Sequence, residues 1–163
     1  MKPIRVGLLG LGVVGSGVWT VLAQNRSEIA RRAGRNIEVV AVAVRDVAKA
    51  RKLVGSSVRV LDDGMALVRD PDIDIIVELI GGETLARTCI LEAIAQGKHV
   101  VTANKALLAA HGNEIFAAAH EHGVMVAFEA AVAGGIPIIK AIREGLTANR
   151  IQWLAGIING TTN

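Results

Sequence analysis

The chain has 163 residues, of which 52% are hydrophobic and 2% aromatic, and its net charge is +3. This length suits one domain, or one domain and part of another, with a core of aliphatic side chains. The small, dispersed positive charge and the scarcity of aromatic residues argue against a nucleic-acid partner. The single cysteine, Cys89, excludes a disulfide within the chain and a thiolate metal cluster.

No apolar stretch reaches the roughly 18 residues that a membrane helix needs. The N-terminal Met1-Lys2-Pro3 runs straight into a strand pattern, which is not the pattern of a signal peptide. We therefore expect a cytoplasmic protein with no membrane partner.

Strand and helix patterns alternate along the chain. Strands are predicted at residues 4–9, 37–44, 58–61, 73–80, 99–102, 124–128 and 151–158. Helical patterns cover residues 14–29, 46–54, 64–68, 85–94 and 113–122, and a further helix begins near Pro137. Leu85, Cys89 and Phe116 are expected on inward helix faces.

Repeated strand–helix units predict an α/β fold, a doubly wound parallel sheet whose ligands bind at the carboxyl ends of the strands. The dense Ile and Val of residues 73–80 predict a central strand. The residues that follow each strand are therefore the candidate site.

The first strand leads into Gly10-Leu11-Gly12-Val13-Val14-Gly15, which opens a helical segment. These glycines allow a tight turn, close approach of the backbone to a pyrophosphate, and close packing of the helix on the strand. The helix N-terminus adds free N–H groups and a positive dipole. The motif predicts a dinucleotide site, and the alternative is a glycine-rich turn with no ligand.

Arg45-Asp46 follows the second strand, and Lys49, Arg51 and Lys52 come within two helical turns. An acid at this place binds a ribose 2′-hydroxyl, whereas an Arg accommodates a 2′-phosphate. The basic residues favour NADP over NAD, with use of both expected. Alternatively, Arg45 and Asp46 are a surface charge and a helix cap.

After the fourth strand, Gly81 and Gly82 let the backbone pass close to a flat ligand. Glu78 is costly to bury unpaired, so it is either hydrogen-bonded to backbone amides or close to the site. After the fifth strand, Thr102 leads to Lys105, whose ammonium could polarise a carbonyl or donate a proton. Its charge opposes the dipole of a helix beginning there. The alternative is a solvated lysine.

Glu129 follows the sixth strand and precedes a turn of small residues, a pattern that presents several oxygens to one point. Such glycine-rich loops usually only connect elements. His120 and His122 do not share a helix face, so we interpret them as solvated surface.

Several of these segments together resemble homoserine dehydrogenases. The resemblance implies a Rossmann-like NAD(P)-binding domain of an oxidoreductase that interconverts L-homoserine and L-aspartate 4-semialdehyde in threonine, methionine and isoleucine biosynthesis. It also implies roles for Arg45 at the 2′-phosphate and Lys105 at both cofactor and substrate. The matching residues are 10–15, 77–82, 101–107, 129–137 and 156–163.

The resemblance further implies a monovalent cation site, typically sodium, formed by Glu129 and the carbonyls of Val132, Gly134 and Ile136. Members of the family are much longer, and their substrate domain carries a second lysine. We therefore expect residues 1–135 to be the nucleotide-binding domain and residues 136–163 to begin a truncated substrate domain. The 163-residue chain alone is expected to be inactive.

A strand at residues 151–158 with free edges invites pairing with another chain, which predicts a homo-oligomer. Two rival functions remain: a dihydrodipicolinate reductase-like enzyme of the same fold, and a non-catalytic nucleotide-sensing domain. The segments around Lys105 and Glu129 argue against the first. The second would have no use for them.

Overall fold

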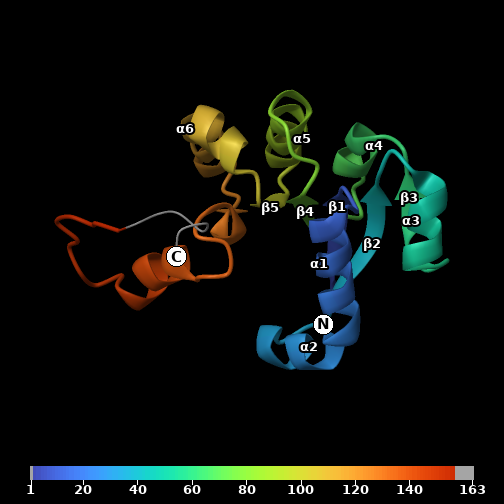
Figure 1. Cartoon of the computed structure of the whole chain (residues 1–163), viewed down its shortest axis with the longest axis horizontal. Helices are drawn as coiled ribbons and strands as arrows, with labels where there is room; N and C mark the ends of the chain where they lie inside the picture. The colour runs from blue at the N-terminus through green and yellow to red at the C-terminus, as the bar shows by residue number, and fades with distance from the viewer. Residues whose placement is uncertain (1, 157–163) are drawn as a thin grey trace.

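The computed structural model describes residues 2–156, and its core is a six-stranded parallel sheet with helices on both faces (Figure 1). The strand order is β3-β2-β1-β4-β5-β6. This arrangement confirms the predicted doubly wound α/β fold and the interior position of β4. The strands are β1 (Ile4–Leu9), β2 (Ile37–Ala43), β3 (Arg59–Leu61), β4 (Ile75–Glu78), β5 (His99–Thr102) and β6 (Val126–Ala127).

Two sets of helices cover the two faces of the sheet. Helices α1 (Val13–Gln24) and α3 (Val47–Val54) pack on one face, where α1 contributes Val18, Trp19 and Leu22 to an aliphatic cluster. Helix α2 (Arg26–Ala33) follows α1 and has no buried residue. The opposite face carries α4 (Gly64–Arg69), α5 (Thr84–Ala95) and α6 (Lys105–Glu121).

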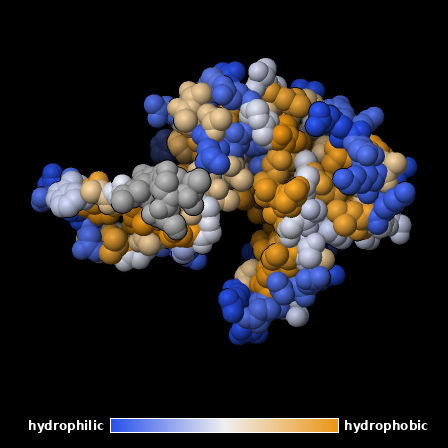
Figure 2. Space-filling model, viewed as in Figure 1, coloured by the Kyte–Doolittle hydropathy of each residue, from blue (hydrophilic) through white to orange (hydrophobic). Residues whose placement is uncertain are grey.

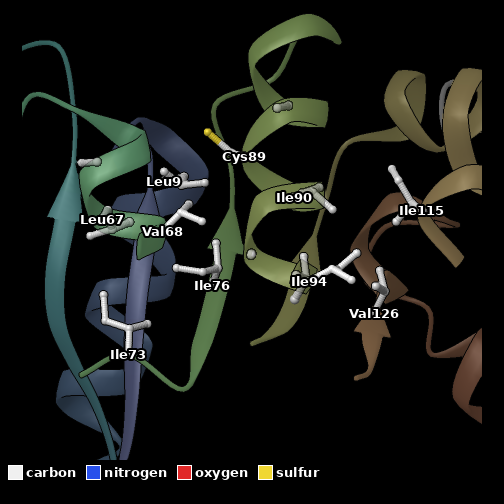
Figure 3. Packing of buried hydrophobic residues seen from close by; sticks show 14 of the residues in the cluster. Leu9, Leu67, Val68, Ile73, Ile76, Cys89, Ile90, Ile94, Ile115 and Val126 are labelled. Carbon is white, nitrogen blue, oxygen red and sulfur yellow. The ribbon is translucent and has the colours of Figure 1, made fainter. Parts of the chain in front are cut away.

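The larger core cluster lies under α4, α5 and α6 (Figure 3). Leu9 of β1 and Ile76 of β4 meet Leu67 of α4, Ile90 of α5 and Ile115 of α6, and none of these side chains is more than 1% exposed. Because branched aliphatic side chains fill both faces, the strands read as almost continuous apolar runs in the sequence.

Local polar groups set the helix boundaries that periodicity missed. The single helix expected at 14–29 is two helices, because Asn25 (φ −101°, ψ 20°) ends α1 and begins α2. Helix α6 begins at Lys105, well before residue 113, because the Asn104 side chain accepts from the backbone N–H of Leu107. Gly34 ends α2 in the left-handed conformation that glycine adopts without strain.

After β6, the helix expected near Pro137 is present, whereas the expected strand is absent from residues 151–156. A 3-10 turn (Glu129–Ala131) leads to α7 (Ile138–Lys140) and a π-helical turn (Ala141–Gly145), which extend beyond the β6 edge of the sheet (Figure 1). The strand expected at 151–158 is wrong for residues 151–156, which form no strand, and the rest of it lies outside the described residues. A strand needs paired neighbours to be stable, and this segment has none among residues 2–156.

Two further side-chain predictions are wrong. Leu85 is 57% exposed at the start of α5, and Phe116 is 37% exposed on α6, where its ring contacts that of Phe128. Within residues 2–156, no helix has the length and apolar character needed to cross a membrane.

Candidate functional site

Because all six strands run parallel, their carboxyl ends meet at one edge of the sheet. Leu9, Glu78 and Thr102 are register partners across β1, β4 and β5. The glycine turn after β1 and the turn after β5 are therefore two strand spacings apart, about 10 Å. This row of loops is the candidate site.

At two positions of the glycine turn after β1, neighbouring atoms leave no room for a side chain. Gly10 has φ +96°, and a Cβ on it would lie 2.9 Å from the carbonyl oxygen of Leu79. A Cβ on Gly15 would lie 2.3 Å from the carbonyl oxygen of Gly10. A Cβ on Gly12, in contrast, would meet no atom within 4 Å, so this backbone is open to a close approach.

The first turn of α1 is suited to an anion. Helix α1 has no side-chain cap and no acidic residue in its first turn, so its leading N–H groups keep their positive field. The first two helical residues, Val13 and Val14, are 92% and 55% exposed. The predicted turn thus has the steric and electrostatic properties of a pyrophosphate cradle.

The two charged residues of the loop after β2, Arg45 and Asp46, have different surroundings. Asp46 caps α3, because its carboxylate accepts from the backbone N–H of Lys49 at 3.0 Å. Arg45 is exposed and forms no ion pair with any residue between 2 and 156. Lys49 lies in the first turn of α3, whereas Arg51 and Lys52 lie in its last turn, away from Arg45.

The loops after β4 and β5 are joined by hydrogen bonds. The Glu78 carboxylate is fully buried and accepts from the N–H groups of Ile80 (2.9 Å) and Gly81 (3.1 Å) and from the Thr102 hydroxyl (2.6 Å). Both interpretations left open for Glu78 therefore hold: it is bonded to backbone amides and it lies at the candidate site.

Sequence reasoning missed Asn104, whose side chain reaches across to the neighbouring loop. Its Nδ2 donates to the carbonyl oxygen of Gly82 at 2.6 Å, while its Oδ1 accepts from Leu107. The signal that could have found it is the preference of Asn for the position just before a helix.

Lys105 is the first residue of α6 and is exposed. A cation at a helix N-terminus is unfavourable by about 0.3–1 kcal/mol. Its ammonium forms no ion pair with the part of the chain that the structure describes, so it is available to a ligand at this edge.

The candidate cation loop folds back on α7. The two Glu129 oxygens accept from the N–H groups of Ile139 and Lys140, both at 2.9 Å. Of the three carbonyls in the predicted set (Val132, Gly134 and Ile136), that of Ile136 already accepts from Ile138. No cluster of three or more His, Cys, Asp or Glu side chains able to hold a metal ion occurs in residues 2–156.

The remaining candidates are structural. Cys89 is fully buried on α5, 3.9 Å from the sulfur of Met65, and burial raises the pKa of its thiol, with a smaller contribution from Glu78. This confirms it as a core residue. His120 and His122 are exposed, as expected for solvated surface.

The model of the family described as homoserine dehydrogenase, NAD-binding domain, matches residues 10–129, which contain the loops after β1, β2, β4 and β5. The chain belongs to this family. A homoserine dehydrogenase of Pseudomonas aeruginosa is 62% identical over the whole chain, but the chain spans only 37% of that relative's length.

Solved structures agree with this assignment. The crystal structure of a homoserine dehydrogenase from Thiobacillus denitrificans superimposes with a TM-score of 0.91 at 66% identity, covering 99% of this chain and 37% of that one. The Staphylococcus aureus homoserine dehydrogenase gives a TM-score of 0.74 at 39% identity, covering 80% of this chain and 34% of that one. The expected family and Rossmann-like NAD(P)-binding domain are therefore confirmed.

Proposed function

We propose that this chain holds NADP(H), and more weakly NAD(H), along the carboxyl edge of its sheet, as the cofactor-binding part of a homoserine dehydrogenase. The observation that carries the proposal is the uncapped first turn of α1 beside the open backbone of Gly12, two strands from Lys105, which has no ion-pair partner among residues 2–156. The whole enzyme would interconvert L-homoserine and L-aspartate 4-semialdehyde.

Each part of the edge has a place in this proposal. The backbone of the Gly10–Gly15 turn would bind the pyrophosphate, and Arg45 would bind a 2′-phosphate as a charge-assisted pair. The backbone at Gly81 would pass close to the nicotinamide half. Thr102 would contact the cofactor through its main chain, because its hydroxyl is committed to Glu78.

The bound nicotinamide supplies or accepts the hydride. Lys105 would place its ammonium near the carbonyl oxygen of the substrate, where negative charge develops during reduction. Because it begins α6, its backbone is held by the hydrogen bonds of Asn104 on one side and by the helix on the other.

The donor chemistry around Glu129 fits a monovalent cation such as sodium. The carboxylate is held in place by two backbone amides and keeps further lone pairs. Among the backbone hydrogen bonds of turns, loops and helix ends in the described part of the chain, none is accepted by the carbonyl oxygen of Val132 or of Gly134. Glu129, Val132, Gly134 and Ile136 would hold the cation and fix the junction near residue 136 between the nucleotide-binding part (1–135) and the segment that follows.

We also propose a cytoplasmic location, where the free thiol of Cys89 stays reduced, and association between copies. Trp153 and Leu154 are 79% and 64% exposed, and exposed apolar side chains of this size often mark contact surfaces. A monomeric elution volume at high protein concentration would contradict the association.

Calorimetric titration of the chain with NADPH and NADH tests the cofactor proposal, which expects saturable binding with NADPH the tighter ligand. In the complete enzyme, Lys105→Ala should lower kcat by about 100-fold or more, with aspartate semialdehyde as substrate. Unchanged turnover in that variant would contradict the role of Lys105. Binding of NADPH by the wild-type protein without any turnover would favour a nucleotide-sensing role.

A further inference from the structure

Glu78 is the one carboxylate among residues 2–156 that is fully buried, and it lies between two strands of the sheet. It forms no ion pair with the residues that the structure describes. Its charge is compensated only by the donors on Ile80, Gly81 and Thr102. Burying a carboxylate is costly unless it is hydrogen-bonded, so Glu78 depends on these donors and ties together the segments that carry them.

The Thr102 hydroxyl has a fixed direction. Its single proton is donated to Glu78, so it can only accept from the backbone N–H of Asn104, which lies at 3.0 Å. A valine of nearly the same shape would leave both that N–H and one oxygen of Glu78 without this partner.

Asn104 completes a closed set of hydrogen bonds between the loops after β4 and β5, which we call the circuit. Its side chain donates to the carbonyl oxygen of Gly82, which belongs to the same loop whose N–H groups donate to Glu78. The loop after β4 is thus held at two places. Glu78, which is bonded to Thr102, holds the N–H groups of Ile80 and Gly81, and Asn104 holds the carbonyl oxygen of Gly82. This loop contains two consecutive left-handed glycines, Gly81 (φ +71°) and Gly82 (φ +70°), which are the residues with the greatest backbone freedom.

We propose that Glu78 is a positioning residue: through Thr102 and Asn104 it fixes the Gly81-Gly82 loop relative to Lys105, and so forms the nicotinamide half of the cofactor site. This inference rests on the proposed function. It assigns to a fully buried carboxylate the spacing between the two loops that would contact the cofactor.

The test compares NADPH with 2′,5′-ADP, which carries the adenosine half and lacks the nicotinamide. Thr102→Val should weaken NADPH binding about tenfold and leave the Kd of 2′,5′-ADP within about twofold, since only the nicotinamide half depends on the circuit. Thr102→Ser keeps the hydroxyl and should restore NADPH affinity. Thr88→Val is the matched control, because its hydroxyl bonds only to the carbonyl oxygen of Thr84 within α5.

A purely structural role would weaken both ligands together or neither, and either result overturns the proposal. If wild type binds neither ligand, the proposed function fails as well. If Thr102→Val does not fold, amide hydrogen exchange of the ligand-free wild type decides: the N–H groups of Ile80, Gly81 and Asn104 should be protected. Exchange of these three at unprotected rates would overturn the circuit.

Discussion

Replacing single glycines in and near the turn after β1 separates its steric role from its role toward a ligand. In Gly15→Ala the new Cβ would lie 2.3 Å from the carbonyl oxygen of Gly10, whereas real Cβ atoms essentially never come within 3.0 Å. The turn must therefore open by about 0.7 Å. Overpacking of this size costs about 1–3 kcal/mol of unfolding free energy, and it moves the backbone that would hold the pyrophosphate.

Two neighbouring glycines provide matched comparisons, because a Cβ on either would meet nothing within 4 Å. Gly17→Ala lies inside α1 and should stabilise the chain by about 0.5–1 kcal/mol with unchanged NADPH binding. Gly12→Ala should leave the unfolding free energy within about 0.5 kcal/mol. Its methyl group would nevertheless stand where a phosphate approaches, raising the Kd of NADPH about tenfold or more, which corresponds to about 1.4 kcal/mol.

Urea denaturation gives the unfolding free energies of the three variants, and calorimetry gives their NADPH affinities. The expected pattern is loss of stability and binding in Gly15→Ala, loss of binding alone in Gly12→Ala, and neither loss in Gly17→Ala. Wild-type affinity in Gly12→Ala would refute the assignment of this turn to the pyrophosphate.

Three further predictions concern residues on both sides of the site. Arg45→Ala should weaken NADPH binding about 10- to 100-fold, as expected for a charge-assisted hydrogen bond, and leave the Kd of NADH within about twofold. Arg51→Ala, at the far end of α3, is the control. Equal losses of affinity for both nucleotides would contradict the role of Arg45 at the 2′-phosphate. Burial raises the pKa of the Cys89 thiol, so the contribution of the neutral thiol to stability is complete below the ordinary thiol pKa and is lost as pH rises through the raised pKa. Melting curves between pH 8 and 10 should therefore show a shallower alkaline decline in Cys89→Ala than in wild type. An unchanged slope would show that the thiol does not titrate in this range. Ile90→Ala removes a fully buried side chain from α5 and should cost about 2–5 kcal/mol in urea denaturation, whereas a cost below about 1 kcal/mol would mean that this core is not packed as described.

Sequence pattern predicted the sheet well where strands are continuous and apolar. The bounds of β1 and β5 agree with the pattern residue for residue. The last four residues of β1 are all buried, whereas β5 alternates between exposed and buried residues. The parallel, doubly wound character of the sheet and the interior position of β4 were also predicted. Steric demands inside the glycine turn were also readable, since Gly10 and Gly15 are excluded from carrying a side chain by neighbouring backbone.

Features that depend on single polar residues or on contacts between distant parts of the chain could not be predicted from the hydrophobic pattern. The start of α6 depends on the Asn104 cap, and the break between α1 and α2 depends on Asn25, neither of which changes the hydrophobic period. Glu78 and Thr102 lie 24 positions apart in sequence, and only the pairing of β4 with β5 brings them together. Residues 151–156 have a strand-like composition but no strand beside them.

The apolar surface left outside the core follows the same logic. Figure 2 shows hydrophobic side chains on the exposed surface near α1, where Val13, Val14 and Val21 are each more than half exposed. A pattern of apolar residues cannot distinguish a side chain that the sheet covers from one that stays open at the start of a helix. Two of the three open positions, Val13 and Val14, are next to the turn assigned to the cofactor.

A nuclear magnetic resonance titration of the ¹⁵N-labelled chain with NADPH tests the central claim most directly. If NADPH binds along the carboxyl edge of the sheet, we expect the largest amide shifts at residues of that edge: Gly12, Gly15, Arg45, Gly81 and Lys105. Shifts confined to the opposite edge, around residues 71–74 and 96–99, or no shifts at saturating NADPH, would contradict it.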